Sequence, residues 1–153
     1  MKKLILVLLI IVSINSHAQD LKWYTNVKEA IAISNKEKKP LMMFFTGSDW
    51  CGWCVRLQNE VLLTPEFKKW AQSNVVLVEL DYPRRTPQLP EIKQQNEELQ
   101  KVFGIQGFPT IFFANVVKDK DDKLNFKPLG KTGYVAGGPQ AWLAEANGYL
   151  KNK

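Results

Sequence analysis

Trp50-Cys51-Gly52-Trp53-Cys54 joins an apolar run of strand length, Leu41 to Phe45, to a segment from Val55 to Leu63 whose spacing predicts a helix. Two cysteines separated by two residues at a strand-to-helix junction can close a small disulfide ring and open it again with little movement of the backbone. The sequence therefore predicts a redox-active pair at the centre of this chain.

The two thiols of this pair are expected to differ in acidity. The unpaired N–H groups and the positive dipole end of a helix stabilise a nearby thiolate, so Cys51 at the helix start is predicted to be the more acidic thiol. Cys54, one turn further along, is expected to be buried and less acidic. Cys51 would then attack a partner's disulfide, and Cys54 would attack the Cys51 sulfur to release the reduced partner.

Three other roles for the cysteines are less favoured. A structural zinc site usually has four Cys or His ligands, whereas this chain has only 2 cysteines and 1 histidine, His17. A structural disulfide would close a very short loop, and short loops stabilise a fold least in the chain-entropy model. Two thiols that only pack in a core do not explain the flanking tryptophans at this junction. The sequence thus predicts no metal and no other cofactor.

The N-terminus carries the pattern of a secretory signal peptide. Lysines precede an apolar run, Leu4 to Val12, and Ser16-His17-Ala18 places small residues at the two positions that a signal peptidase recognises. We expect cleavage after Ala18, which makes 1–18 a cleavable signal peptide and 19–153 a single domain. An uncleaved membrane anchor is less favoured, because the run is short for a membrane span and no positive residues flank its far end.

Export would place the domain in a periplasmic or secreted setting, where disulfides persist. Cleavage would also remove His17, so Ser-His and Cys-His catalysis are excluded for the remaining chain. The formal net charge of +6 comes from scattered lysines, and an exported protein seldom meets nucleic acid, so we attribute the charge to solubility. We expect no nucleic-acid partner and no stable membrane insertion after the signal is removed.

The remaining pattern predicts an α/β domain in which helical and apolar segments alternate. A helical segment separates the first two strands, so they should be parallel and joined by a right-handed crossover. The charged turn from Lys118 to Lys123 should join the last two strands as a hairpin, and the proline-rich segment 81–90 should be a loop. The predicted strands are 41–46, 75–80, 110–116 and 124–129, and the predicted helices are 26–39, 55–63, a short one from 64, 91–103 and 137–150.

Two motifs in order then identify a family resemblance: Trp50-Cys51-Gly52-Trp53-Cys54 after one strand, and Gly104-Ile105-Gln106-Gly107-Phe108-Pro109-Thr110 before a later one. From about residue 26 to residue 150 the chain resembles the thioredoxin superfamily. It is most similar to exported thioredoxin-like proteins with an extended loop after the second core strand, here Asp81 to Asn96. The resemblance implies a thioredoxin-like fold, a central mixed four-stranded sheet flanked by helices.

The resemblance also implies a cis peptide bond before Pro109, which would place this proline against the cysteine pair beside backbone that can bind an extended substrate. Without it, a trans bond would be expected, because cis bonds are a small minority of X-Pro bonds. Aromatic side chains would form an apolar rim around the sulfurs. The candidate site is therefore the catalytic pair Cys51 and Cys54 with the substrate-binding residues Trp50, Gly52, Trp53, Phe108 and Pro109.

Three positions depart from the family pattern. Thioredoxins carry a buried Asp six residues before the first active-site cysteine, and this chain has Phe45 there. The strand position at which they often carry a nearby Lys is aligned with Leu77, so both members of the polar pair are expected to be apolar together, which avoids a lone buried charge. Trp53 replaces the proline between the cysteines, so the reduction potential is not expected to match that of thioredoxins.

Together these features predict an exported thiol-disulfide oxidoreductase. Its partners would be proteins with disulfides or thiols, together with a redox partner that resets the dithiol. The sequence does not decide among reductase, isomerase and oxidase. A non-catalytic thioredoxin-like binding module with a redox-sensitive dithiol is the alternative, because fold does not imply function and both the polar pair and the loop from Pro83 to Pro90 are unusual.

Overall fold

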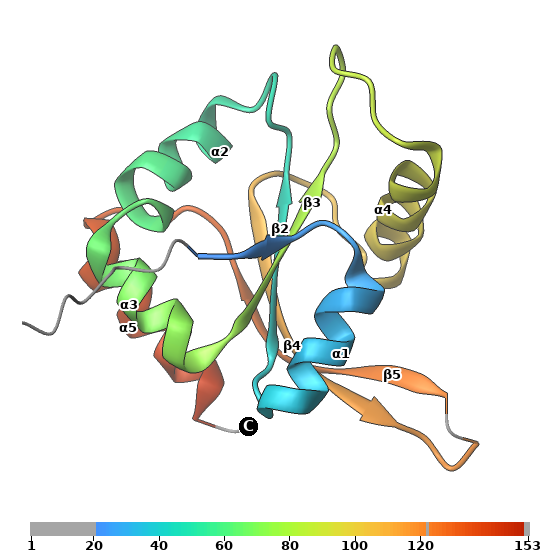
Figure 1. Cartoon of the computed structure of the whole chain (residues 1–153). Helices are drawn as coiled ribbons and strands as arrows, with labels where there is room; N and C mark the ends of the chain where they lie inside the picture. Colours follow the sequence, from blue (N-terminus) through green and yellow to red (C-terminus); the bar gives the residue numbers. More distant parts are fainter. Residues whose placement is uncertain (1–20, 122, 152–153) are drawn as a thin grey trace, which may run out of the picture.

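A five-stranded mixed sheet forms the middle of the domain, with helices on both of its faces (Figure 1). This computed structural model describes residues 21–121 and 123–151, so the predicted signal peptide, 1–18, lies outside the described residues. The elements in chain order are β1 (Trp23–Tyr24), α1 (Val27–Glu37), β2 (Leu41–Thr46), α2 (Gly52–Leu57), the π-helical segment η1 (Gln58–Leu62), α3 (Pro65–Asn74), β3 (Val76–Asp81), α4 (Pro90–Val102), β4 (Thr110–Lys118), β5 (Leu124–Thr132) and α5 (Gly138–Leu150).

The predicted fold class is confirmed, and the sheet has one strand more than expected. Its order is β1-β3-β2-β4-β5. Strands β2 and β3 are parallel, and β4 and β5 form the expected antiparallel hairpin. The additional strand β1 has only 2 residues and pairs with β3 at the edge of the sheet. Such a short strand gives no periodic pattern, which is why the sequence does not predict it.

The two faces of the sheet carry separate apolar clusters. Successive side chains of a strand point to opposite faces. Phe44 therefore lies on the face covered by α2, α3 and α5, together with Cys51 and Cys54. Phe45 lies on the other face, among residues of α1 and α4. Figure 1 shows α2, α3 and α5 on one side of the sheet and α1 and α4 on the other. The cysteine pair thus belongs to only one of the two clusters.

Helices α1 and α3 begin where their capping residues predict. The Asn26 side chain accepts a hydrogen bond from the backbone N–H of Lys28, and Thr64 caps α3 just before Pro65. The predicted helix 55–63 is helical, but it begins earlier, at the start of α2, and ends as the π-helical segment η1. No helix within the described residues is long and apolar enough to cross a membrane. The end of β2 at Thr46 and the capping residue of α2, Cys51, bound the reactive turn, residues 47–51.

Candidate active site

The reactive turn begins where β2 ends. The backbone N–H groups of Trp50 and Cys51 both donate to the backbone oxygen of Gly47, at 3.2 and 2.8 Å. Cys51 has extended backbone angles and is the capping residue of α2, so its side chain faces the first turn of that helix. A strand that ends in a tight turn and continues as a helix thus places the first cysteine at the helix start, as the sequence predicts.

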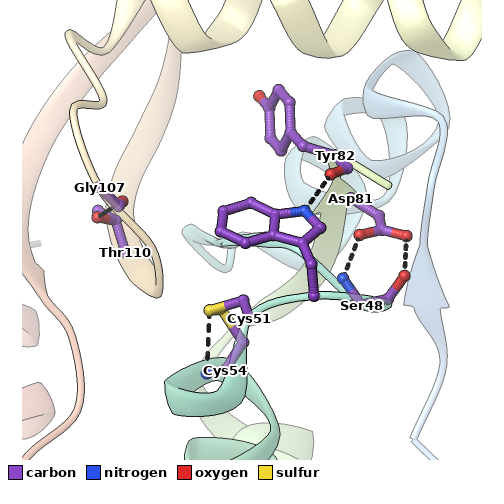
Figure 2. Close-up of a disulfide and its surroundings, with 8 residues drawn as sticks. Ser48, Cys51, Cys54, Asp81, Tyr82, Gly107 and Thr110 are labelled. Carbon is purple, nitrogen blue, oxygen red and sulfur yellow. Dashed lines mark hydrogen bonds between the residues drawn. A yellow bond between two sulfur atoms is a disulfide. The ribbon is translucent and has the colours of Figure 1, made fainter. Parts of the chain in front are cut away.

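The two cysteines form a disulfide, with 5.3 Å between their Cα atoms. The backbone N–H of Cys54 donates to the Sγ of Cys51 at 3.2 Å, and Figure 2 shows this bond. Both residues are buried, and Cys51 remains slightly the more exposed, at 6% against 1% for Cys54. In the reduced pair, a sulfur that faces this N–H is the better placed of the two to carry a negative charge.

The second motif lies against the first, as the resemblance implies. The peptide bond between Phe108 and Pro109 is cis. The ring of Phe108 meets the ring of Trp50 edge-on, with 5.6 Å between centroids. The turn is closed by a hydrogen bond of 2.8 Å from the Thr110 hydroxyl to the Gly107 oxygen, and Figure 2 shows these two residues across from the disulfide. Trp50 and Phe108 therefore form one continuous part of the predicted rim.

Trp53 lies apart from Trp50 and Phe108. Its side chain is 55% exposed and packs against Tyr134, with 5.2 Å between ring centroids. Gly52 is exposed, with open space where a side chain would be. The structure thus gathers Trp50 and Phe108 on one side of the cysteine pair and brings Trp53 together with Tyr134. A partner that reaches the sulfurs can meet aromatic rings in both places.

The residues that pack around Trp53 are not predicted from the sequence. The guanidinium of Arg56 lies over the rings of Trp53 and Tyr134, at 5.3 and 4.9 Å from their centroids. Glu60 accepts hydrogen bonds from the Tyr134 hydroxyl and from Arg56, at 2.5 and 2.7 Å. These two bonds, that from Tyr134 foremost, lower the pKa of Glu60. Only the i,i+4 spacing of Arg56 and Glu60 is visible in the sequence, because Tyr134 comes from a distant segment.

The loop after β3 is fastened to the reactive turn by hydrogen bonds. Asp81 accepts from the backbone N–H and the hydroxyl of Ser48, at 2.8 and 2.5 Å, as Figure 2 shows. The Trp50 indole N–H donates to the backbone oxygen of Tyr82 at 2.8 Å. These contacts hold the end of β3 and the residues before Cys51 as one unit.

Phe45 and Leu77 are both apolar and buried, as expected, but they do not lie beside one another. In the sheet register Phe45 is opposite Leu80, whereas Leu77 is opposite Met42. Phe45 belongs to the cluster on the α1 and α4 face, and Leu77 belongs to the cluster that includes the cysteines. Side chains alternate along each strand, so a difference of one residue moves a side chain to the other face. The apolar residues on the cysteine face of β2 are Met42 and Phe44.

Glu79 is an acidic residue on the cysteine face of β3. Phe44 is its partner in the register with β2, and the alternation along β3 places Glu79 on the same face as Leu77. Burial raises the pKa of the Glu79 carboxyl, and the negative charge of Asp81 raises it further. This carboxyl is therefore harder to ionise than an exposed one. No group of three or more potential metal ligands occurs in the part of the chain that the structure describes.

Comparison with known proteins agrees with this geometry. The thioredoxin-like domain family matches residues 27–118. The disulfide bond reductase DsbH of Chlamydia pneumoniae is 36% identical over 119 residues, which cover 78% of this chain and 71% of that protein. The chain therefore belongs to the thioredoxin-like domain family and is a thiol-disulfide oxidoreductase.

Solved structures give the same result. A structure of a DsbH oxidoreductase matches with a TM-score of 0.73 and 34% identity, over 87% of this chain and 86% of that one. A thioredoxin from Thermus thermophilus matches with a TM-score of 0.59 and 20% identity, over 83% of this chain and 85% of that one. The first is similar in sequence and fold, whereas the second shows only that the fold is shared. The partners of this chain are thus proteins that exchange thiols and disulfides.

Proposed function

We propose that this chain reduces disulfides in exported proteins, with Cys51 as the attacking thiolate and Cys54 as the resolving thiol. The observation that carries this assignment is the hydrogen bond from the Cys54 N–H to the Cys51 sulfur at the start of α2. A donor aimed at one sulfur favours its ionised form over that of the other. Similarity to a disulfide bond reductase supports reduction as the direction.

In each step of the proposed reaction, one S–S bond breaks and another forms. The Cys51 thiolate attacks one sulfur of a partner disulfide, and the other partner sulfur leaves as a thiolate that takes up a proton. Cys54 then loses its proton and attacks the Cys51 sulfur, which expels the second partner thiolate. The partner gains two electrons and two protons, and the chain is left with the Cys51–Cys54 disulfide described above. A second dithiol must supply electrons to reset it.

The partner's backbone is proposed to lie across the aromatic rim. Exposed or half-buried rings beside the sulfurs can pack against apolar side chains, and the open space at Gly52 admits a close approach. The turn at Gly107 leaves backbone groups near the cysteines. The residues assigned to substrate binding are Trp50, Gly52, Trp53, Phe108 and Pro109.

Export is the remaining part of the proposal. Residues 1–18 would be removed as a signal peptide, which leaves 19–153 as one domain in the periplasm or outside the cell. N-terminal sequencing of the protein purified from the exported fraction tests this proposal. A sequence that starts at Gln19 is the expected result, and an intact N-terminus in the membrane fraction would contradict it.

Reduction of insulin disulfides in the presence of dithiothreitol tests the activity. The wild type should accelerate insulin precipitation, and the double variant Cys51→Ser, Cys54→Ser should match buffer alone. Redox equilibrium with glutathione then tests the direction, because a reductase keeps its own dithiol strongly reducing relative to that couple. No acceleration by the wild type would refute the enzymatic proposal, and an oxidising potential would refute reduction as its direction.

A further inference from the structure

Two arginines are held beside the reactive turn by a single carboxylate. Asp49, two residues before Cys51, accepts hydrogen bonds from the backbone N–H groups of Arg84, Arg85 and Thr86, at 3.0, 2.8 and 2.9 Å. The bond from Arg84 foremost, with those from Arg85 and Thr86, lowers the pKa of Asp49 to about 2. The loop after β3 is therefore fixed to a residue of the reactive turn.

An aromatic ring also helps to fix the position of the Arg84 side chain. Its guanidinium lies over the indole of Trp50, 3.7 Å from the ring centroid. The same indole meets Phe108, the residue before the cis proline, at its edge. Arg84 thus lies on the part of the rim that Trp50 and Phe108 form. A guanidinium that rests on a ring is partly desolvated and oriented before any partner arrives.

The charged groups on this surface differ in how far they are already hydrogen-bonded within the chain. The carboxylates of Asp49 and Asp81 already accept hydrogen bonds from groups within the chain, whereas the exposed Glu97 lines the same pocket as Arg84. Arg84 and Arg85 are exposed, and no ion pair within the described residues involves either of them. The Arg85 guanidinium donates a hydrogen bond to the backbone oxygen of Asp49. The Arg84 guanidinium therefore contacts the Trp50 ring but forms no ion pair within the described residues, which suits a partner that brings an acidic group.

We propose that Arg84, assisted by Arg85, binds a carboxylate that lies close to the reactive cysteine of the partner, so that the enzyme prefers disulfides flanked by Asp or Glu. This inference rests on the disulfide exchange proposed above and adds a substrate class to it. The planar guanidinium matches a carboxylate with two parallel hydrogen bonds. Complementary charge also raises the rate of encounter.

The test uses three disulfide-linked peptides that differ only at the residues flanking the cysteines, which are Glu, Gln or Lys. We measure kcat/KM for each peptide with the wild type, Arg84→Gln, Arg84→Glu and Arg84→Lys. The wild type should prefer the Glu peptide over the Lys peptide by about fivefold at low salt, the scale of a partly exposed ion pair, and the preference should shrink at high salt. Arg84→Gln should reduce the ratio towards one, Arg84→Glu should invert it, and Arg84→Lys should keep part of it.

The control is Lys28→Glu, which makes the same change of charge as Arg84→Glu, on an exposed residue of α1. It should leave the ratio as in the wild type. If Arg84→Gln and Arg84→Glu keep the wild-type ratio while all three peptides are still reduced, the inference fails and the enzymatic function stands. If the wild type reduces none of the peptides, the proposed function itself fails.

Discussion

The indole Nε1 of Trp50 donates a hydrogen bond of 2.8 Å to the backbone oxygen of Tyr82. This bond joins the residue before Cys51 to the first residue after β3, so the reactive turn and a central strand hold each other in place. Gly47 lies beneath the same indole, and a Cβ added there would overlap the ring. The absence of a side chain at position 47 is therefore what allows Trp50 to reach Tyr82.

Gly47→Ala is expected to displace the indole and to break its bond with Tyr82. Disulfide exchange should slow by roughly tenfold, because a small misplacement of groups around a reacting atom is costly. The overpacked site should also lose about 1–3 kcal/mol of stability. Insulin reduction and urea unfolding measure the two effects. Gly148→Ala is the control: it has open space and lies in α5, so stability should rise by about 0.5–1 kcal/mol with unchanged activity.

The sequence predicts those parts of the site that depend on neighbouring residues. The strand before Trp50, the helix after Cys51 and the caps at Asn26 and Thr64 are all local features, and the structure confirms them. The cis bond at Pro109 could be predicted only from the family resemblance, since nothing local favours it.

Contacts between distant segments could not be predicted in this way. Tyr134 reaches Glu60 across 74 residues, and Asp49 accepts from Arg84 across 35. No spacing rule connects such pairs, because the fold rather than the sequence period brings them together. The separation of Phe45 and Leu77 has a similar origin, since the alternation of side chains and the register between β2 and β3 place them on opposite faces of the sheet.

Removal of the Asp49 carboxylate should release the loop that carries Arg84 and Arg85. In Asp49→Ala, trypsin should cleave after these arginines several times faster than in the wild type, because cleavage requires local opening. Asp49→Asn keeps one acceptor oxygen and should give an intermediate rate. Mass spectrometry of the early fragments identifies the cut sites. Equal cleavage at 84 and 85 in all three proteins would show that Asp49 does not hold the loop.

The pKa of Asp49 also predicts how the loop responds to acid. A lowered pKa means that the folded state favours the ionised form, so this contribution to stability is present above the usual value of 3.8 and is lost as the pH falls through about 2. Protection of the Arg84 to Thr86 amides against hydrogen exchange, corrected for the intrinsic rate, should therefore persist to about pH 3. Loss of protection near pH 5 would contradict this assignment.

Phe45→Asp should destabilise the fold. Phe45 is fully buried and its ring packs against Tyr82 and Phe103, so a carboxyl there would lose these contacts and its hydration. We expect a loss of several kcal/mol and a raised carboxyl pKa. Phe45→Leu, which keeps an apolar side chain, should cost much less. Urea unfolding of both variants is the measurement. Similar urea midpoints for Phe45→Asp and the wild type would show that this position is accessible to water.

Glu79→Gln should raise stability at neutral pH. An acid with a raised pKa in the folded state favours the protonated form, so the stability of the wild type falls as the pH rises from the usual 4.5 through the raised value. The amide removes this penalty, and the two proteins should have nearly equal stability at about pH 4. Glu91→Gln, in the first turn of α4, should instead lose stability at neutral pH. Thermal unfolding at both pH values gives the comparison, in which equal differences at the two values would exclude a titrating Glu79.

Replacement of either cysteine separates the attacking thiol from the resolving one. Cys51 would form the covalent bond to the partner and Cys54 would break it, so Cys54→Ala should stop the reaction at the mixed disulfide and partners should accumulate on Cys51. Cys51→Ala leaves only the more buried sulfur, 1% exposed, which should trap little. Both variants are expressed in the exported compartment, free thiols are alkylated, and non-reducing gels are compared with reduced ones. Reducible adducts confined to Cys54→Ala would support this order of attack. Equal trapping by both variants would refute this order of attack, and absence of adducts in both would favour the alternative, a binding module.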